Sequence, residues 1–153
     1  ELCGSGYPAE AAVVFDWENY WSFSISSGPC DTRQKKYVET VLEHYRALWT
    51  QNVPLDVIES LSDFSKYRLL VCPMLLMLKP GVAERLKAFV SGGGTLVMTC
   101  LSGCEDESGR CFLDGWPGDG LMDLFGIWNE EIGGIPPFDR QSLRATFMRA
   151  LPP

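Results

Sequence analysis

Two carboxylates and a cysteine are the side chains of this sequence that could take part in catalysis. Asp16 and Glu18 lie two residues apart after a short apolar run. Carboxylate pairs act as acid and base in glycoside hydrolysis, but there the two groups usually come from different strand ends across a cleft. Two acids on one short segment more often cap a helix or bind a neighbouring cation. We therefore predict no catalytic residue here.

Cys100 comes at the end of another apolar run, where class I glutamine amidotransferases carry a nucleophile on a tight turn. In those enzymes the nucleophile stands two residues before a glycine. In this sequence the residue two positions before Gly103 is Leu101, and Cys100 comes one residue too early. A cysteine nucleophile also needs a base. The single histidine, His44, falls beside the polar face of a predicted helix, so no Cys-His pair is expected. A small amidotransferase-like or DJ-1-like hydrolase using Cys100 remains the alternative function.

The other motifs of this sequence indicate no cofactor and no metal. One histidine excludes multi-histidine metal sites, and there is no dinucleotide or phosphate-binding glycine loop. Cys72 and Cys100, at the ends of apolar runs, are interpreted as small buried residues in a reducing compartment. The six cysteines include no CxxC spacing, which gives a zinc ribbon or redox pair no support: they are Cys3, Cys30, Cys72, Cys100, Cys104 and Cys111.

Strands and helices alternate along the chain. Short apolar runs predict buried strands at residues 11–15, 55–58, 67–72 and 95–99, and helical periodicity predicts helices at 30–52 and 80–90. Asp31 and Gln34 resemble a capping pair. A short helix is expected at 120–125 and a last strand at 127–132. This order predicts a doubly wound α/β fold with a mostly parallel sheet in three layers α/β/α, flavodoxin-like or class I glutamine amidotransferase-like.

Composition narrows the classes of partner. The chain has 153 residues, 17.1 kDa, and a formal net charge of -7, the wrong sign for binding phosphate backbones. Nucleic acid is therefore not expected as a partner. The longest apolar run, residues 69–78, is interrupted by Pro73 and is half the length of a membrane-spanning helix. We expect no membrane span.

Aromatic residues are concentrated just after the first predicted strand. Trp and Tyr are enriched at protein interfaces, and exposed rings are costly in water. These rings must therefore pack on their own domain or against another subunit. The interface candidates on this loop are Trp17, Tyr20, Trp21 and Phe23.

Several ordered motifs resemble the trimerisation domain of glycoside hydrolase family 42 β-galactosidases. They are AAVVFDWENYW (11–21), HYRALW (44–49), VPLD (53–56), YRLLVCP (67–73), GGTLVMT (93–99), SG (102–103), EDE (105–107) and LFGI (124–127). The resemblance covers about residues 9–131. Cys100 and Cys104 depart from it, since apolar or small residues are expected there.

The resemblance implies a noncatalytic middle domain that forms a homotrimer and shapes the active-site entrance of a cytoplasmic parent enzyme. The catalytic glutamates of such enzymes lie in a (β/α)8 barrel, a further partner, and neither can be placed on this sequence. The expected organisation is a loose start at 1–8, the amidotransferase-like trimerisation domain at 9–132, and a linker or tail at 133–153 toward an absent C-terminal domain. The absence of an initial methionine suggests a chain cut from a longer one.

Overall fold

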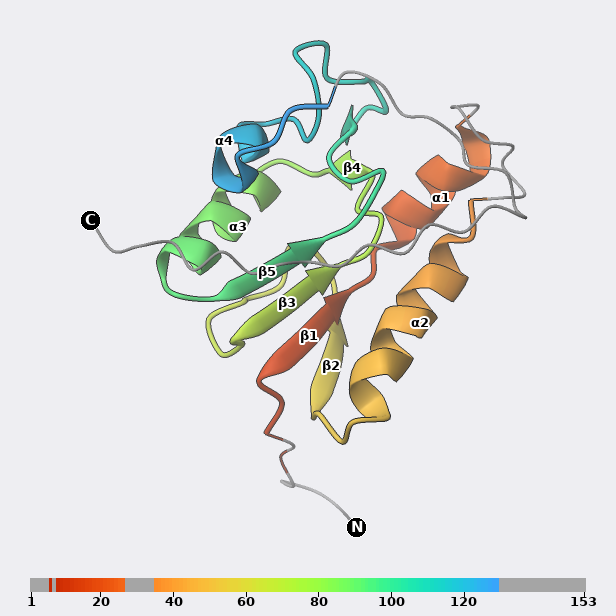
Figure 1. Ribbon diagram of the computed structural model, residues 1–153. Helices are drawn as coiled ribbons and strands as arrows, with labels where there is room; N and C mark the ends of the chain where they lie inside the picture. The colour runs from red at the N-terminus through yellow and green to blue at the C-terminus, as the bar shows by residue number, and fades with distance from the viewer. Residues whose placement is uncertain (1–5, 7, 27–34, 130–153) are drawn as a thin grey trace.

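A computed structural model describes residues 6, 8–26 and 35–129 of the chain (Figure 1). The expected capping pair at Asp31 and Gln34 and the proposed tail at 133–153 lie outside these residues. The elements, in chain order, are β1 (Ala11–Val14), α1 (Trp17–Ile25), α2 (Tyr37–Trp49), β2 (Leu55–Ile58), β3 (Leu69–Cys72), β4 (Met77–Leu78), α3 (Val82–Ser91), β5 (Thr95–Met98), β6 (Glu105–Asp106) and α4 (Leu121–Phe125).

The main sheet is parallel and has the strand order β2-β1-β3-β5. All four strands were expected from their apolar runs, because parallel strands bury both faces. Helix α2 covers one face of the sheet, while α3 and α4 lie on the other (Figure 1). The prediction of a doubly wound α/β fold in three layers is confirmed.

Alternating side chains of β1 build the two cores. Ala12 and Val14 pack with Leu86 of α3 in one cluster, whereas Ala11 and Val13 face the cluster that contains α2. This alternation is the period of a strand. Because β1 is central and buried on both faces, its carboxyl end is a rigid position from which to start a helix.

Helix α2 differs from its predicted length. It begins at Tyr37, because Lys36 has a non-helical backbone, and ends at Trp49. Asn52, which was expected to be helical, has a φ of 59° in the turn to β2, a conformation that Asn tolerates better than most residues. Two of its large apolar residues, Leu42 and Trp49, are exposed.

The segment after β1 is a helix, not the loop that we expected. One helical face has the i, i+3, i+4 spacing, which is that of Trp17, Tyr20 and Trp21. We interpreted these residues only by their aromatic type and did not use their spacing. Asp16 occupies the N-cap position with an extended backbone. The aromatic residues are therefore ordered by a helix.

Beyond β3 the chain forms a second, two-stranded sheet that the sequence did not predict, in which β4 pairs with β6. Helix α4 was predicted. Of the expected last strand at 127–132, Asn129 forms a single antiparallel bridge with Trp116, residues 127 and 128 are not in a strand, and residues 130–132 are outside the described part. No helix in the described part of the chain is both long and apolar enough to cross a membrane.

Candidate functional site

The outward side of α1 carries an aromatic face made by Trp17, Tyr20 and Trp21. Their exposed fractions are 55%, 38% and 58%. The rings of Trp17 and Tyr20 meet edge to face at 5.9 Å between centroids, and Phe15 meets Trp17 in the same way at 5.1 Å. Such edge contacts fix ring orientation. The aromatic face is thus a large apolar surface with partly fixed rings.

Phe23, the fourth interface candidate, lies on the opposite side of α1. Its ring is buried and stacks on Tyr37 of α2 with 5.4 Å between centroids. Phe23 comes two residues after Trp21, a rotation of about 200° around the helix, which turns its side chain away from Trp21 and toward the core. The structure therefore makes Phe23 a residue that anchors α1 and leaves three candidates exposed.

Polar side chains hold the inner side of α1 to the β3–β4 connection and to β6. The buried Asn19 amide donates to the Met74 carbonyl oxygen at 2.8 Å and accepts from the Met77 backbone N–H at 3.1 Å. Ser22 Oγ donates to Glu105 Oε2 at 2.6 Å. Our sequence analysis missed Asn19 and Ser22, although their three-residue spacing opposite the rings would have marked an inner helical face. These bonds orient the aromatic face.

A buried ion pair holds the start of α1. Lys79 Nζ lies 3.2 Å from Asp16 Oδ1 and 3.3 Å from Glu18 Oε2, and the Asp16 side chain is 1% exposed. Asp16 Oδ1 also accepts the Ser60 backbone N–H at 3.0 Å. Burial lowers the pKa of Lys79, but the two carboxylates outweigh it and the pKa is raised. Of the two structural roles considered for these acids, capping a helix and binding a neighbouring cation, the structure shows the second.

The pKa of the Glu18 carboxyl is lowered, first by a hydrogen bond from the backbone at the start of the helix and further by Lys79. Glu18 is therefore ionised at neutral pH. It is also half exposed at the edge of the aromatic face. Glu18 thus gives this otherwise apolar face its one negative charge.

Cys100 lies in the turn after β5. It is exposed, which contradicts the expectation of a buried residue, because the strand ends at Met98 and the chain turns outward. Leu101, at the position that would hold the nucleophile, has a φ of 61°. His44 Nδ1 lies 2.8 Å from the Thr40 carbonyl oxygen of its own helix. Helix α2 covers β1 and β2, whereas β5 is the far strand of the sheet. This arrangement does not support a thiol hydrolase.

Two other cysteines are buried thiols. Cys72 is enclosed in the core as expected, and burial raises its pKa. Burial is also the main cause that raises the pKa of Cys104 to about 12. Within residues 6, 8–26 and 35–129, no three His, Cys, Asp or Glu side chains are grouped so as to hold a metal ion.

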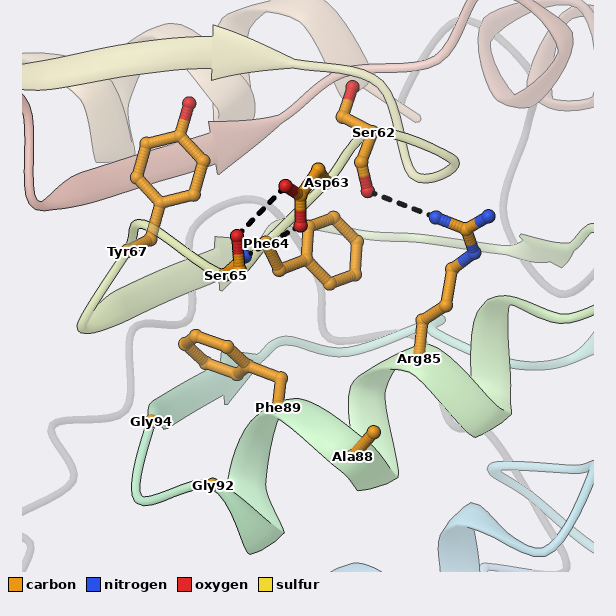
Figure 2. Close-up of a pocket in the computed structure, with 10 residues that line it drawn as sticks. All are labelled: Ser62, Asp63, Phe64, Ser65, Tyr67, Arg85, Ala88, Phe89, Gly92 and Gly94. Carbon is orange, nitrogen blue, oxygen red and sulfur yellow. Dashed lines mark hydrogen bonds between the residues drawn. The ribbon is translucent and has the colours of Figure 1, made fainter.

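A separate pocket of about 330 Å³ lies between the β2–β3 connection and α3 (Figure 2). Its polar groups are bonded to one another: Asp63 accepts from Ser65, and Arg85 donates to the Ser62 carbonyl oxygen. Phe64 and Phe89 close its floor edge to face. These contacts attach the β2–β3 connection to α3, which is a structural role.

Comparisons with known proteins agree on one family. The family model described as "Beta-galactosidase trimerisation domain" matches residues 9–150. The chain is 47% identical to Beta-galactosidase Pbg of Clostridium perfringens over 135 residues, 88% of this chain and 19% of that protein. It is also 47% identical to Beta-galactosidase BglY of Alicyclobacillus acidocaldarius over 143 residues, 94% of this chain and 20% of that protein.

A solved structure shows the same fold. The crystal structure of β-galactosidase from Bacillus circulans sp. alkalophilus superposes with a TM-score of 0.85 and 40% identity, covering 90% of this chain and 20% of that one. The chain therefore spans about one fifth of the length of the proteins that it matches.

Proposed function

This chain belongs to the family of β-galactosidase trimerisation domains, and we propose that it assembles a larger glycoside hydrolase family 42 β-galactosidase into a homotrimer. In that role it contributes no catalytic group. It holds neighbouring subunits together and shapes the entrance to the active sites. The positions of Cys100 and His44 do not support the alternative function as a cysteine hydrolase.

The observation that supports assembly is the aromatic face of α1. Trp and Tyr contribute much of the binding energy at interfaces, because their rings bury a large area at a small cost in side-chain entropy. Asn19 and the Asp16–Lys79 pair already fix the helix that carries them. A surface fixed before binding loses less entropy when a partner binds.

The proposed parent enzyme contains a catalytic barrel in addition to this chain. The matched proteins are about five times longer and are named β-galactosidases, which supports a parent with separate catalytic residues. We propose that residues 9–132 form the assembling unit and that 133–153 lead to a C-terminal domain. The thiols Cys72, Cys104 and Cys111 fit a cytoplasmic parent, where cysteines stay reduced.

Sedimentation of the full-length parent enzyme tests the proposal. We expect a trimer, and we expect Trp21→Ala to weaken it by about 2 kcal/mol or more per contact, as hot-spot residues do. The same substitution should change the free energy of unfolding by less than about 0.5 kcal/mol, since the ring is exposed. The control Phe23→Ala should cost about 3 kcal/mol of folding stability because it empties a core position.

The reverse pattern would contradict the interface assignment. If Trp21→Ala destabilises the fold as much as Phe23→Ala and leaves the trimer intact, the aromatic face is part of the core of the parent. A parent that sediments as a monomer would contradict the assembly role itself.

A further inference from the structure

A second exposed apolar patch lies along α2 and β2, and we propose that it receives the aromatic face of a neighbouring copy of this chain. The patch consists of Leu42, Trp49 and Val57, whose exposed fractions are 44%, 61% and 55%. This inference rests on the proposed role in trimer assembly. In this arrangement the α2–β2 patch is the second of the two surfaces that form each contact between subunits.

Symmetry requires two different surfaces. In a twofold dimer one patch pairs with its own copy, whereas in a closed threefold ring each contact joins one patch to another patch on the neighbour. The aromatic face of α1 can therefore be only half of a trimer contact. The other half must be apolar, exposed and located elsewhere on the domain.

The α2–β2 patch meets these requirements by its geometry. Leu42 and Trp49 are seven residues apart, which places them two turns apart on the same side of α2. Val57 lies two residues after the buried Leu55, so both side chains project to the sheet face that α2 covers. Val57 also belongs to β2, the outermost strand of the described sheet.

Each surface has one charged group that could meet an opposite charge on the other. Arg46 is exposed and lies one turn of α2 from both Leu42 and Trp49. Among the described residues it forms no ion pair. Glu18, at the edge of the aromatic face, shares Lys79 with the buried Asp16, so the two carboxylates and one ammonium together keep one negative charge there. A guanidinium group can pair with the Glu18 carboxylate or stack on an indole ring, two contacts that favour Arg at interfaces.

Cysteine cross-linking of the full-length parent tests this contact. In every variant Cys3, Cys30, Cys100 and Cys111, the cysteines of this chain other than the buried Cys72 and Cys104, are replaced by serine. We expect Trp21→Cys combined with Trp49→Cys to give a covalent trimer under mild oxidation on a non-reducing gel. Either substitution alone should give no cross-link, and a mixture of the two single variants should stop at a covalent dimer. The matched control combines Trp21→Cys with Trp128→Cys, which joins the aromatic face to another exposed tryptophan.

Each other result overturns the inference in a distinguishable way. A cross-linked dimer from Trp21→Cys alone would show an interface that pairs identical surfaces. A covalent trimer in the Trp128→Cys control and not in the Trp49→Cys variant would move the contact to another face. No cross-link in a parent that still sediments as a trimer would refute the α2–β2 patch and leave the assembly role standing. A monomeric parent would refute both.

Discussion

The carboxyl ends of β1 and β5 lie at the same edge of the sheet, yet they use their polar residues differently. After β1, Asp16 is buried and bound to Lys79, and Asn19 bonds to the β3–β4 connection. After β5, Thr99 Oγ1 accepts the Met74 N–H at 2.8 Å while the Cys100 thiol is exposed. The end of β1 therefore positions an aromatic helix, and the end of β5 forms a turn.

The difference shows that residue types suited to catalysis serve structure at this edge. Asn19 from the β1 side and Thr99 and Ser102 from the β5 side bond the same connection around Met74 and Leu75. Buried backbone groups need such partners, because leaving them unpaired costs as much as a lost hydrogen bond. Because these polar groups point inward, the surface that remains available to a partner at this edge of the sheet is the aromatic face of α1.

The largest expected effect concerns thiol reactivity after β5. The pKa of Cys104 is raised to about 12, so at pH 8 only about one thiol in 10⁴ is ionised and reactive. We expect alkylation of native Cys104 to be at least about a thousandfold slower than that of the exposed Cys111, as followed by mass spectrometry of digests. In urea the two rates should converge. Equal rates in the native state would mean that the β5 end is open rather than packed.

Next in size is the effect of removing the cation after β1. Lys79→Met keeps the side-chain length but leaves the buried Asp16 without its counter-ion. Breaking a buried pair from one side should lower the free energy of unfolding by about 3 kcal/mol in urea titrations. The control Glu18→Gln removes the exposed partner and should cost less than about 1 kcal/mol. Similar losses in both variants would show that burial does not distinguish the two acids.

A smaller loss is expected from the amide that holds α1. Asn19→Ala leaves the Met74 carbonyl and the Met77 N–H without their partner, which should cost about 2 kcal/mol of unfolding free energy. The control Ser24→Ala, on the exposed side of the same helix, should stay within about 0.5 kcal/mol. If both variants have the stability of the parent sequence, α1 is not fixed by polar contacts and the aromatic face is not pre-organised.

The sequence predicted the main sheet, α3 and α4 well because their apolar runs are local signals. The apolar run 95–99, for example, matches β5 to within one residue. We did not predict α1, since its inner residues Asn19 and Ser22 are polar, and we interpreted the helical spacing of the aromatic residues as a loop. The partners of the Asp16 and Asn19 side chains lie more than 40 residues away in sequence. Such contacts depend on topology, which no local pattern specifies.

The smallest expected effect tests the strained turn after β5. Leu101 has a φ of 61°, a left-handed conformation that costs roughly 1–2 kcal/mol for a residue with a Cβ and little for glycine. We expect Leu101→Gly to be more stable than Leu101→Ala by about 1 kcal/mol, because both lose the same leucine contacts and only glycine loses the strain. Thermal and urea unfolding of the two variants measure this difference.

Val97 in the neighbouring strand supplies the opposite control. It is partly exposed and lies in the regular part of β5, where glycine loses more chain entropy on folding than alanine does. Val97→Gly should therefore be less stable than Val97→Ala by about 0.5–1 kcal/mol. If the alanine variant is more stable than the glycine variant at Leu101 as well, the turn carries no left-handed strain. The backbone at the end of β5 is then as free of strain as the backbone at the end of β1.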